Sequence, residues 1–491
     1  MRKHFILFLS ILFLLTSCTF QSKTADPVVT NDLSTLNWSS CRGNFQCATM
    51  KVPIDYSNKS LGEFNIAVIR YRDSSQHDRI GSLVVNPGGP GASGVEFALD
   101  AEYIVNPDVL ERYDIVGFDP RGVGESSPIH CLSAKEQDEI FASDAKPDNN
   151  AEYAKALKDT QDYVNKCLAK TPDISHYSTQ EAAKDMDVLR AALGDKKLNY
   201  MGFSYGTYLG ALYAQEFPQN VGQFILDGAI DFSIPIEEQI IVQASSFDSA
   251  LSNFIADCHK QSDCPLPVNA TSQYFIDLFK RVSYTPLKVD NRLITENLVV
   301  TGTAAALYDD VSGWSSLKSA ISEAHNGDGT TFAKLADTYN GRNSDGTYSN
   351  NENDANVIIS CLDWKQHRTI SQIRSQVTTY EKAAPVLGPY VAYSGITCNL
   401  LSETLKLQIP ENKKISFSTQ TPVLIIGTTH DPATPYEWAQ GLNTFIIGSR
   451  LITLKGEGHT AYGRGSACID DAVDNYLVKG TVPPKKLMCT Q

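Results

Sequence analysis

Short apolar runs alternate with helix-like segments between about residues 50 and 230, and this rhythm restricts the possible folds more than any other feature. The runs interpreted as strands are FNIAVIRYR (64–72), GSLVVNPGGPG (81–91), YDIVGFDPRGVGES (113–126), KLNYMGFS (197–204) and VGQFILDGAI (221–230). Helical patterns fill 181–194, which ends at a glycine, and 205–218, which ends at a proline. Strands that alternate with helices predict right-handed β-α-β units and a mostly parallel sheet flanked by helices.

The rhythm stops after residue 230 and returns near the C-terminus. The intervening block is rich in helical patterns and in Asn/Gly/Asp-rich loops such as NGRNSDGTYSNNENDAN (340–356), and strand-like segments follow at 421–435 and 449–460. A sheet interrupted in this way predicts one α/β core with an insertion. We expect the core at 41–230 and 416–491, with a helical cap at 231–415 inserted after the sixth core strand.

The first 17 residues have the pattern of an export signal. Arg2 and Lys3 form a positive start, and an apolar run of 11 residues follows from Phe5 to Leu15. That run is too short to span a bilayer comfortably, because a transmembrane helix needs about 20 residues. We therefore interpret residues 1–17 as a signal peptide.

The signal ends in Leu-Thr-Ser-Cys at Cys18, which is similar to a bacterial lipobox. In such proteins the chain is cut before the cysteine, which then carries the lipid. The sequence therefore predicts an exported lipoprotein held at a membrane through Cys18, with residues 18–40 as a tether. Thr19 favours an outer membrane, periplasmic or surface location over retention at an inner membrane. The alternative is an ordinary signal peptide that is cut nearby.

The balance of charge excludes one class of partner. The chain has 42 Lys and Arg against 56 Asp and Glu, a net charge of −14. Loss of residues 1–17 would remove two of the basic residues and bring this to about −16. A surface this acidic repels a nucleic-acid backbone, so we expect no nucleic-acid partner.

Cysteine usage predicts disulfides and no metal site. Eleven cysteines are present, and setting Cys18 aside for lipid leaves ten, an even number in an exported chain. No C-x-x-C pair or Cys/His cluster has the spacing of a zinc site. The simplest connectivity, one of many possible, joins neighbours in sequence: Cys41–Cys47, Cys131–Cys167, Cys258–Cys264, Cys361–Cys398 and Cys468–Cys489.

The stretch GFSYGTYLG (202–210) places Ser204 between a strand and a helix. A catalytic serine in an α/β protein needs this context, with glycines where the turn is too tight for side chains. Gly202 and Gly206 occupy those positions, and the helix start presents free N–H groups to a developing negative charge. A lone G-x-S-x-G also arises by chance at simple turns, so the interpretation depends on partners elsewhere.

Two partners lie downstream in the order that such a serine requires, an acid and then a histidine. Asp431 follows one strand pattern in IIGTTHDPATP, and His459 follows the next in KGEGHT. We expect His459 to act as general base and then acid, with Asp431 fixing its tautomer. Local competitors are His430 and Glu457.

A glycine-rich loop supplies the remaining element. NPGGPGASG (86–94) follows a strand, and its glycines let the backbone approach a substrate carbonyl closely. We expect an oxyanion hole made by the N–H groups of Gly89 and Tyr205. A phosphate-binding loop is excluded because G-x-x-x-x-G-K-[ST] is absent from the sequence.

Together NPGGPGASG, GFDPRGVGES, GFSYGTYLG, GTTHDPATP and GEGHT resemble α/β-hydrolases of the proline iminopeptidase and tripeptidyl aminopeptidase group, over roughly residues 40–489. The resemblance implies an α/β-hydrolase fold and a serine exopeptidase without cofactor, which releases tripeptides or N-terminal residues through an acyl-enzyme. Asn86-Pro87 stands where many iminopeptidases have a histidine, which favours the secreted tripeptidyl branch.

The resemblance also implies peptide substrates with a free N-terminus and carboxylates that bind the amine. Candidates are Glu96, just past the glycine loop, and Asp363 in IISCLDW; each could instead be a surface or structural carboxylate.

Two other functions stay open. A carboxylesterase or lipase would use the same three residues, and a binding module could reuse an inactive hydrolase scaffold. Epoxide hydrolases and dehalogenases are disfavoured because they need an aspartate at position 204.

Overall fold

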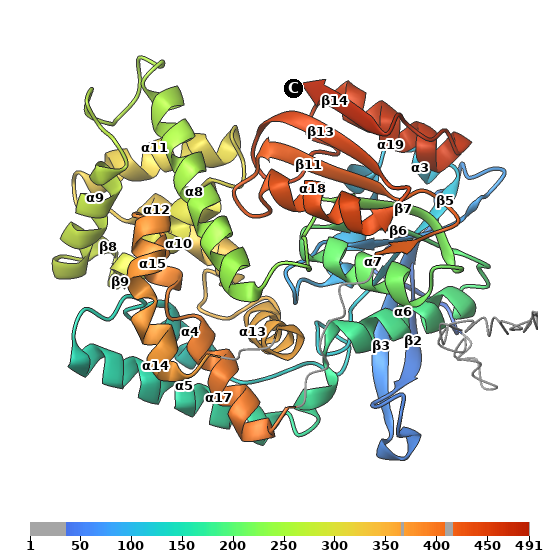
Figure 1. The fold of residues 1–491 in the computed structure, drawn as a ribbon, viewed down its shortest axis with the longest axis horizontal. Coiled ribbons are helices and arrows are strands. Elements are labelled where there is room, and N and C mark those ends of the chain that lie inside the picture. The colour runs from blue at the N-terminus through green and yellow to red at the C-terminus, as the bar shows by residue number, and fades with distance from the viewer. Residues whose placement is uncertain (1–35, 365–367, 408–415, 491) are drawn as a thin grey trace, which may run out of the picture.

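A computed structural model of the chain describes residues 36–364, 368–407 and 416–490 (Figure 1). Its centre is a ten-stranded sheet in the order β1-β2-β3-β5-β4-β6-β7-β11-β13-β14. The strands from β5 to β14 in this order run parallel, whereas β1, β2 and β3 pair antiparallel at one edge. The strands are β1 (Ser39–Cys41), β2 (Phe45–Pro53), β3 (Glu63–Tyr71), β4 (Gly81–Asn86), β5 (Tyr113–Phe118), β6 (Leu198–Phe203), β7 (Val221–Asp227), β11 (Leu424–His430), β13 (Arg450–Glu457) and β14 (Lys486–Thr490).

Helices cover both faces of the sheet. The strands are apolar on both faces, so each face packs against its own set of helices. In β4 the side chain of Val84 joins one hydrophobic cluster while Leu83 and Val85 join the other, because alternate residues of a strand face opposite sides. The cluster with Val84 includes α6 (Thr179–Ala192), α7 (Tyr205–Glu216) and α18 (Tyr436–Phe445). The opposite cluster includes α1 (Gly94–Ala98), α2 (Ala101–Ile104), α3 (Pro107–Leu110) and α19 (Ala467–Lys479).

The segment between β7 and β11 is a helical unit beside the sheet (Figure 1). Much of it packs on a hydrophobic cluster of its own, which runs from Ala250 to Leu387. Its elements are α8 (Ile236–Cys258), α9 (Gln273–Tyr284), β8 (Leu287–Val289), β9 (Arg292–Ile294), α10 (Glu296–Ala306), α11 (Ser312–Ala324), α12 (Thr330–Asn340), α13 (Glu352–Asp363), α14 (Ile370–Ser375), α15 (Val377–Ala383), α16 (Gly388–Val391), α17 (Gly395–Leu405) and β10 (Phe417–Ser418), which pairs with β12 (Ile446–Ile447).

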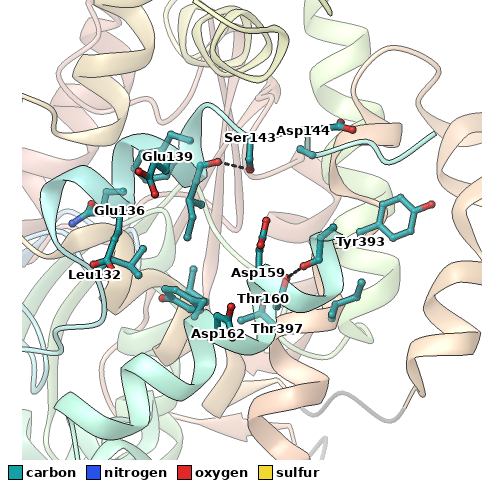
Figure 2. A pocket seen from close by; sticks show the side chains of 18 of the residues that line it. Leu132, Glu136, Glu139, Ser143, Asp144, Asp159, Thr160, Asp162, Tyr393 and Thr397 are labelled. Atoms are coloured by element: carbon teal, nitrogen blue, oxygen red, sulfur yellow. Dashed lines mark hydrogen bonds between the residues drawn. The ribbon is translucent and has the colours of Figure 1, made fainter. Parts of the chain in front are cut away.

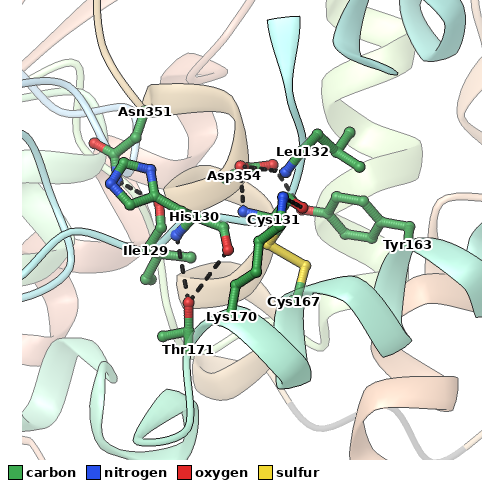
Figure 3. The surroundings of a disulfide bond; sticks show 10 residues. All are labelled: Ile129, His130, Cys131, Leu132, Tyr163, Cys167, Lys170, Thr171, Asn351 and Asp354. Carbon is green, nitrogen blue, oxygen red and sulfur yellow. Dashed lines mark hydrogen bonds between the residues drawn. A yellow bond between two sulfur atoms is a disulfide. The ribbon is translucent and has the colours of Figure 1, made fainter. Parts of the chain in front are cut away.

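Helices α4 (Ala134–Phe141) and α5 (Asn150–Lys170) lie with this unit rather than on the sheet, and α5 packs on α17 (Figure 1). Figure 3 shows the reason: Asp354 of α13 accepts hydrogen bonds from the N–H groups of Cys131 and Leu132, at 2.7 and 3.2 Å. The disulfide Cys131–Cys167 then joins that segment to α5. The expected division at residue 230 therefore does not separate all core residues from all cap residues.

Five disulfides form among the described residues, and each joins cysteines that are neighbours in sequence. This is the connectivity that the sequence suggests as simplest. The pairs are Cys41–Cys47, Cys131–Cys167, Cys258–Cys264, Cys361–Cys398 and Cys468–Cys489.

The export signal and Cys18 lie outside the described residues. Within the described part of the chain, every helix is too short or too polar to cross a membrane.

Candidate active site

Ser204 occupies a sharp turn between β6 and α7. Its backbone angles are φ 53° and ψ −125°, a left-handed region that a residue with a side chain rarely adopts. The flanking glycines are required by space: a Cβ atom would lie 2.5 Å from the Gly206 carbonyl oxygen at Gly202 and 2.7 Å from Asn86 Oδ1 at Gly206. The turn presents the half-buried Ser204 side chain at the carboxyl edge of the sheet.

His459 and Asp431 form a hydrogen-bonded pair. Nδ1 of His459 lies 2.9 Å from both carboxylate oxygens of Asp431, whose side chain is fully buried. Asp431 also accepts from the N–H groups of Ala433, Thr434 and Thr460 and from the Thr434 hydroxyl, at 2.8–3.2 Å. The aspartate is therefore held on several sides, and the imidazole presents its other nitrogen, Nε2, for proton transfer.

The two competitors in these loops pair with each other instead. Nδ1 of His430 lies 2.7 Å from Glu457 Oε1, and Asn253 donates to both oxygens of Glu457. His430 and Glu457 are therefore occupied by each other, while Asp431 and His459 form a separate pair.

The end of β7 brings the serine and histidine segments together. The carbonyl of Asp227 accepts from the Ser204 N–H at 2.9 Å. A Cβ atom on the next residue, Gly228, would lie 3.2 Å from Cε1 of His459. Asp227 and Gly228 thus contact both the serine turn and the imidazole of His459.

The glycine loop after β4 lies against the serine turn. A Cβ atom at Gly88 would stand 3.1 Å from both the Ser204 Cβ and the Tyr205 nitrogen, so only glycine fits there. The Gly88 N–H is already bonded to Asn86 Oδ1. The N–H groups of Gly89 and Tyr205 have no acceptor among the described residues, which leaves both available to a substrate oxygen.

Asp363 lies away from this loop and supports Tyr205. It accepts from the N–H and hydroxyl of Thr179, and the same hydroxyl contacts the Tyr205 hydroxyl. Burial raises the pKa of Asp363 to about 7. Asp363 ends α13, and Glu352 begins it, so the helix separates them by about 16 Å. This position does not suit the amine-binding role expected from the sequence.

Glu352 is a site residue that the sequence analysis missed. Its Oε1 lies 3.6 Å from the Cβ position of Gly89, and the Asn356 side chain of the same helix donates to the Pro90 carbonyl at 3.0 Å. Burial raises the pKa of Glu352 to about 7, and the negative charge of Glu96 acts in the same direction. The structure therefore brings Glu352 and the expected Glu96 together beside the glycine loop.

A helical signal for this residue was present in the sequence. The Asn, Gly and Asp content of residues 340–356 predicts a loop. Ala355, Ile358, Ile359 and Leu362 recur at helical spacing and are buried, and α13 begins at Glu352 directly after Asn351.

The helical unit also contacts His459 directly. The Tyr308 carbonyl accepts from the His459 N–H at 2.9 Å, and the two rings meet edge to face at 5.2 Å. Arg464 donates to the carbonyls of both residues and forms an ion pair with Asp310 at 2.8 Å. The histidine loop is thus bound to the segment between α10 and α11.

Two hollows lie near these elements. A cavity of about 700 Å³ lies between α4, α5, α13 and α17 (Figure 2). Asn353, Asp354 and Val357 line it from the face of α13 opposite Glu352, so it is separate from the serine. A second hollow, of about 420 Å³, is lined by Tyr308, Tyr339 and residues of α10, α11 and α12.

Metal ligands are not gathered anywhere in the described part of the chain: it contains no group of three or more His, Cys, Asp or Glu that could hold a metal ion.

Comparison with known proteins identifies the class. The chain belongs to the α/β-hydrolase fold family, whose profile matches residues 81–465. It is 36% identical to "Serine protease Hip1" of Mycobacterium tuberculosis, over 92% of this chain and 91% of that protein.

Two further relatives are similar over the same share of the chain. "Carboxylesterase B" of M. tuberculosis is 34% identical over 92% of this chain and 89% of its own. "Tripeptidyl aminopeptidase" of Streptomyces coelicolor is 30% identical over 92% and 86%. The chain is therefore a serine hydrolase.

Proposed function

We propose that this protein is a serine aminopeptidase that releases short peptides, tripeptides in particular, from free N-termini. The observation that carries the proposal is the position of Glu352 and Glu96 beside the glycine loop that faces Ser204. Two neighbouring carboxylates suit a substrate ammonium, because a cation relieves the repulsion between them. The relatives named serine protease and tripeptidyl aminopeptidase support the proposal that the substrates are peptides.

In the proposed reaction Ser204 attacks the scissile carbonyl carbon. His459 takes the hydroxyl proton on Nε2 and passes it to the departing amine as the C–N bond breaks. Asp431 holds the imidazole through Nδ1 and stabilises the imidazolium. Water then attacks the acyl carbon and gives a proton to His459; the ester bond to Ser204 breaks, and His459 returns that proton to the Ser204 oxygen as the acid leaves.

The negative oxygen of each tetrahedral intermediate would accept from the N–H groups of Gly89 and Tyr205. One such donor contributes about 10²–10³ in kcat in well-studied hydrolases. The hydrogen bonds of Thr179 to Asp363 and Tyr205 hold the second donor in place.

A free amine would bind at Glu352 and Glu96, beside the glycine loop. Glu352 is half-buried and Glu96 is exposed, so the pair lies at the boundary between protein and solvent. Burial favours the protonated form of Glu352, and an ammonium at the site would favour its ionised form. The fixed separation between the amine site and Ser204 would then set the number of residues released.

A carboxylesterase is the second candidate, favoured by the relative named carboxylesterase B. It would use the same serine, histidine and oxyanion groups. It gives no role to Glu352 beside the glycine loop, and for that reason we place it second.

The deciding experiment compares two fluorogenic substrates, Ala-Ala-Pro-aminocoumarin with a free amine and the same peptide N-acetylated. We expect cleavage of the free-amine peptide only, and its loss in Ser204→Ala. Cleavage of neither peptide by a protein whose Ser204 still reacts with a fluorophosphonate would overturn the peptidase and favour the esterase.

We also propose that the enzyme acts at a membrane, anchored by lipid on Cys18. The support is the sequence pattern of residues 1–18. Cys18→Ala should release the enzyme from the membrane fraction in a bacterial host; unchanged fractionation would contradict the anchor.

A further inference from the structure

We propose that Asp227, a buried carboxylate outside the Ser204–Asp431–His459 set, is a positioning residue that holds the His459 loop and places a second negative charge near the imidazole. The inference rests on the proposed role of His459 as base, and it does not depend on whether the substrate is a peptide or an ester.

Asp227 joins the two segments that must meet for catalysis. It is the last residue of β7, and its backbone carbonyl accepts from the N–H of Ser204 at 2.9 Å. Its carboxylate accepts from the N–H of Ala461 at 3.0–3.1 Å and of Tyr462 at 2.8 Å. These two donors follow His459 in the chain by two and three residues, so a single side chain fixes the loop that carries the histidine.

The next residue completes this junction. The Gly228 N–H donates to the Ile426 carbonyl at 3.1 Å, in the strand that leads to Asp431. A Cβ atom at Gly228 would lie 3.0–3.2 Å from Thr434, His459 and Thr460. Residues 227 and 228 therefore contact the segments that carry all three members of the proposed catalytic set.

The Asp227 side chain is fully buried, so its carboxylate is not a solvated surface group. Burial raises the pKa of Asp227 to about 6, and the negative charge of Asp431 acts in the same direction. The N–H groups of Tyr462 and Ala461 and the charge of His459 oppose that shift.

Burying a negative charge is costly, and a neutral acceptor could make the same hydrogen bonds to this turn. The charge gains a purpose when His459 becomes imidazolium during the reaction, because the buried carboxylates of Asp227 and Asp431 then both stabilise it. Arg464, which donates to the His459 carbonyl at 2.7 Å, is the charged side chain that opposes this effect in the same loop.

The test is the pH profile of Asp227→Asn with an activated acetate ester, a substrate that needs no amine site. The asparagine oxygen can keep both N–H donors, so the variant mainly loses the charge. We expect kcat to fall about tenfold and KM to change little. The acid limb of kcat/KM should move to lower pH by about one unit, because the protonated imidazole loses a stabilising charge.

Asp354→Asn is the matched control. Asp354 is also buried and accepts from two consecutive N–H groups, those of Cys131 and Leu132 (Figure 3). Two residues after Glu352, it lies on the opposite face of α13. It should lose stability without a shift of the acid limb. If Asp227→Asn does not fold, Asp227→Ser, whose hydroxyl can accept one donor, is measured in the same way.

An acid limb that stays in place in the folded Asp227 variant would overturn the proposal and leave Asp227 a purely structural residue. Failure of the peptidase proposal would show differently, as ester cleavage without peptide cleavage by the unaltered enzyme.

Discussion

The carboxylate of Glu352 lies beside the backbone of Gly89, with Oε1 3.6 Å from the position that a Cβ atom would take on that glycine. Gly89 supplies one N–H of the proposed oxyanion hole, so this contact places a negative charge beside the loop that is to hold the reacting carbonyl. It also joins the two parts of the molecule, because Glu352 begins a helix of the inserted unit and Gly89 follows a strand of the sheet. The amine selectivity of the enzyme should depend on this contact.

The first prediction concerns Glu352→Gln. The loss of one charge-assisted hydrogen bond should weaken ammonium binding by about 1.5–3 kcal/mol, which is a roughly tenfold to hundredfold rise in KM for free-amine peptides. Activity on an activated acetate ester should not change. Steady-state kinetics on both substrates would check this.

Glu296→Gln is the control for that variant. Glu296 begins α10 as Glu352 begins α13, but its carboxylate is bound by the Tyr390 hydroxyl instead of facing the glycine loop. Its replacement should leave KM unchanged. An equal rise in KM in both variants would mean that the effect comes from net charge alone.

The second prediction is a pH dependence of KM. Because the pKa of Glu352 is raised to about 7, its carboxyl group is mostly neutral below that pH and mostly charged above it. Peptide ammonium groups stay protonated up to about pH 7.7–8.0. KM for free-amine peptides should therefore rise as pH falls from about 7 to 5.5. In Glu352→Gln this dependence should flatten; a wild-type KM that is constant over the range would exclude Glu352 from the site.

The third prediction tests the structural role of Asp363. Its folded pKa of about 7 lies above the ordinary aspartate value of 3.8, so the native state binds the extra proton between about pH 4 and pH 7. This group therefore contributes less stability as pH rises through that window. Asp363→Asn should remove this contribution, because the amide is neutral and can still bond Thr179.

Denaturant titrations at pH 4.5 and 7.5 would measure that difference. KM for free-amine peptides should stay the same in Asp363→Asn. A rise in KM would return Asp363 to the amine site that the sequence suggested.

Local sequence pattern predicts most of the sheet, and it also marks the candidate reacting groups. Ser204, Asp431 and His459 each follow a strand with a clear apolar run (β6, β11 and β13), and the structure places these strands in one parallel sheet, with β7 between β6 and β11. Strand β2 and the last strand, β14, were not predicted, since FQCATMKVP and KLMCT mix polar and apolar residues at the outer part of the sheet.

Glu352 was missed for a different reason. Its importance comes from a contact between α13 and a loop that lies over 250 residues earlier in the chain. No local pattern reports such a contact. Asp363, by contrast, is an amine-binding candidate from the resemblance, and only the structure shows that its carboxylate is bonded by Thr179.

The last prediction concerns the disulfide between Cys131 and Cys167, which closes a loop with a sequence separation of 36. The chain-entropy relation gives it about 4 kcal/mol of stabilisation, against about 2 kcal/mol for Cys41–Cys47, whose separation is 6. Replacing both cysteines of each pair with serine should therefore lower Tm more for 131–167. Only that variant should also raise KM for free-amine peptides, because Asp354 binds the Cys131 N–H and thereby helps to seat α13 and Glu352. Calorimetry and peptide kinetics on both variants would decide, and an unchanged KM in the 131–167 variant would show that α13 keeps its position without this bond.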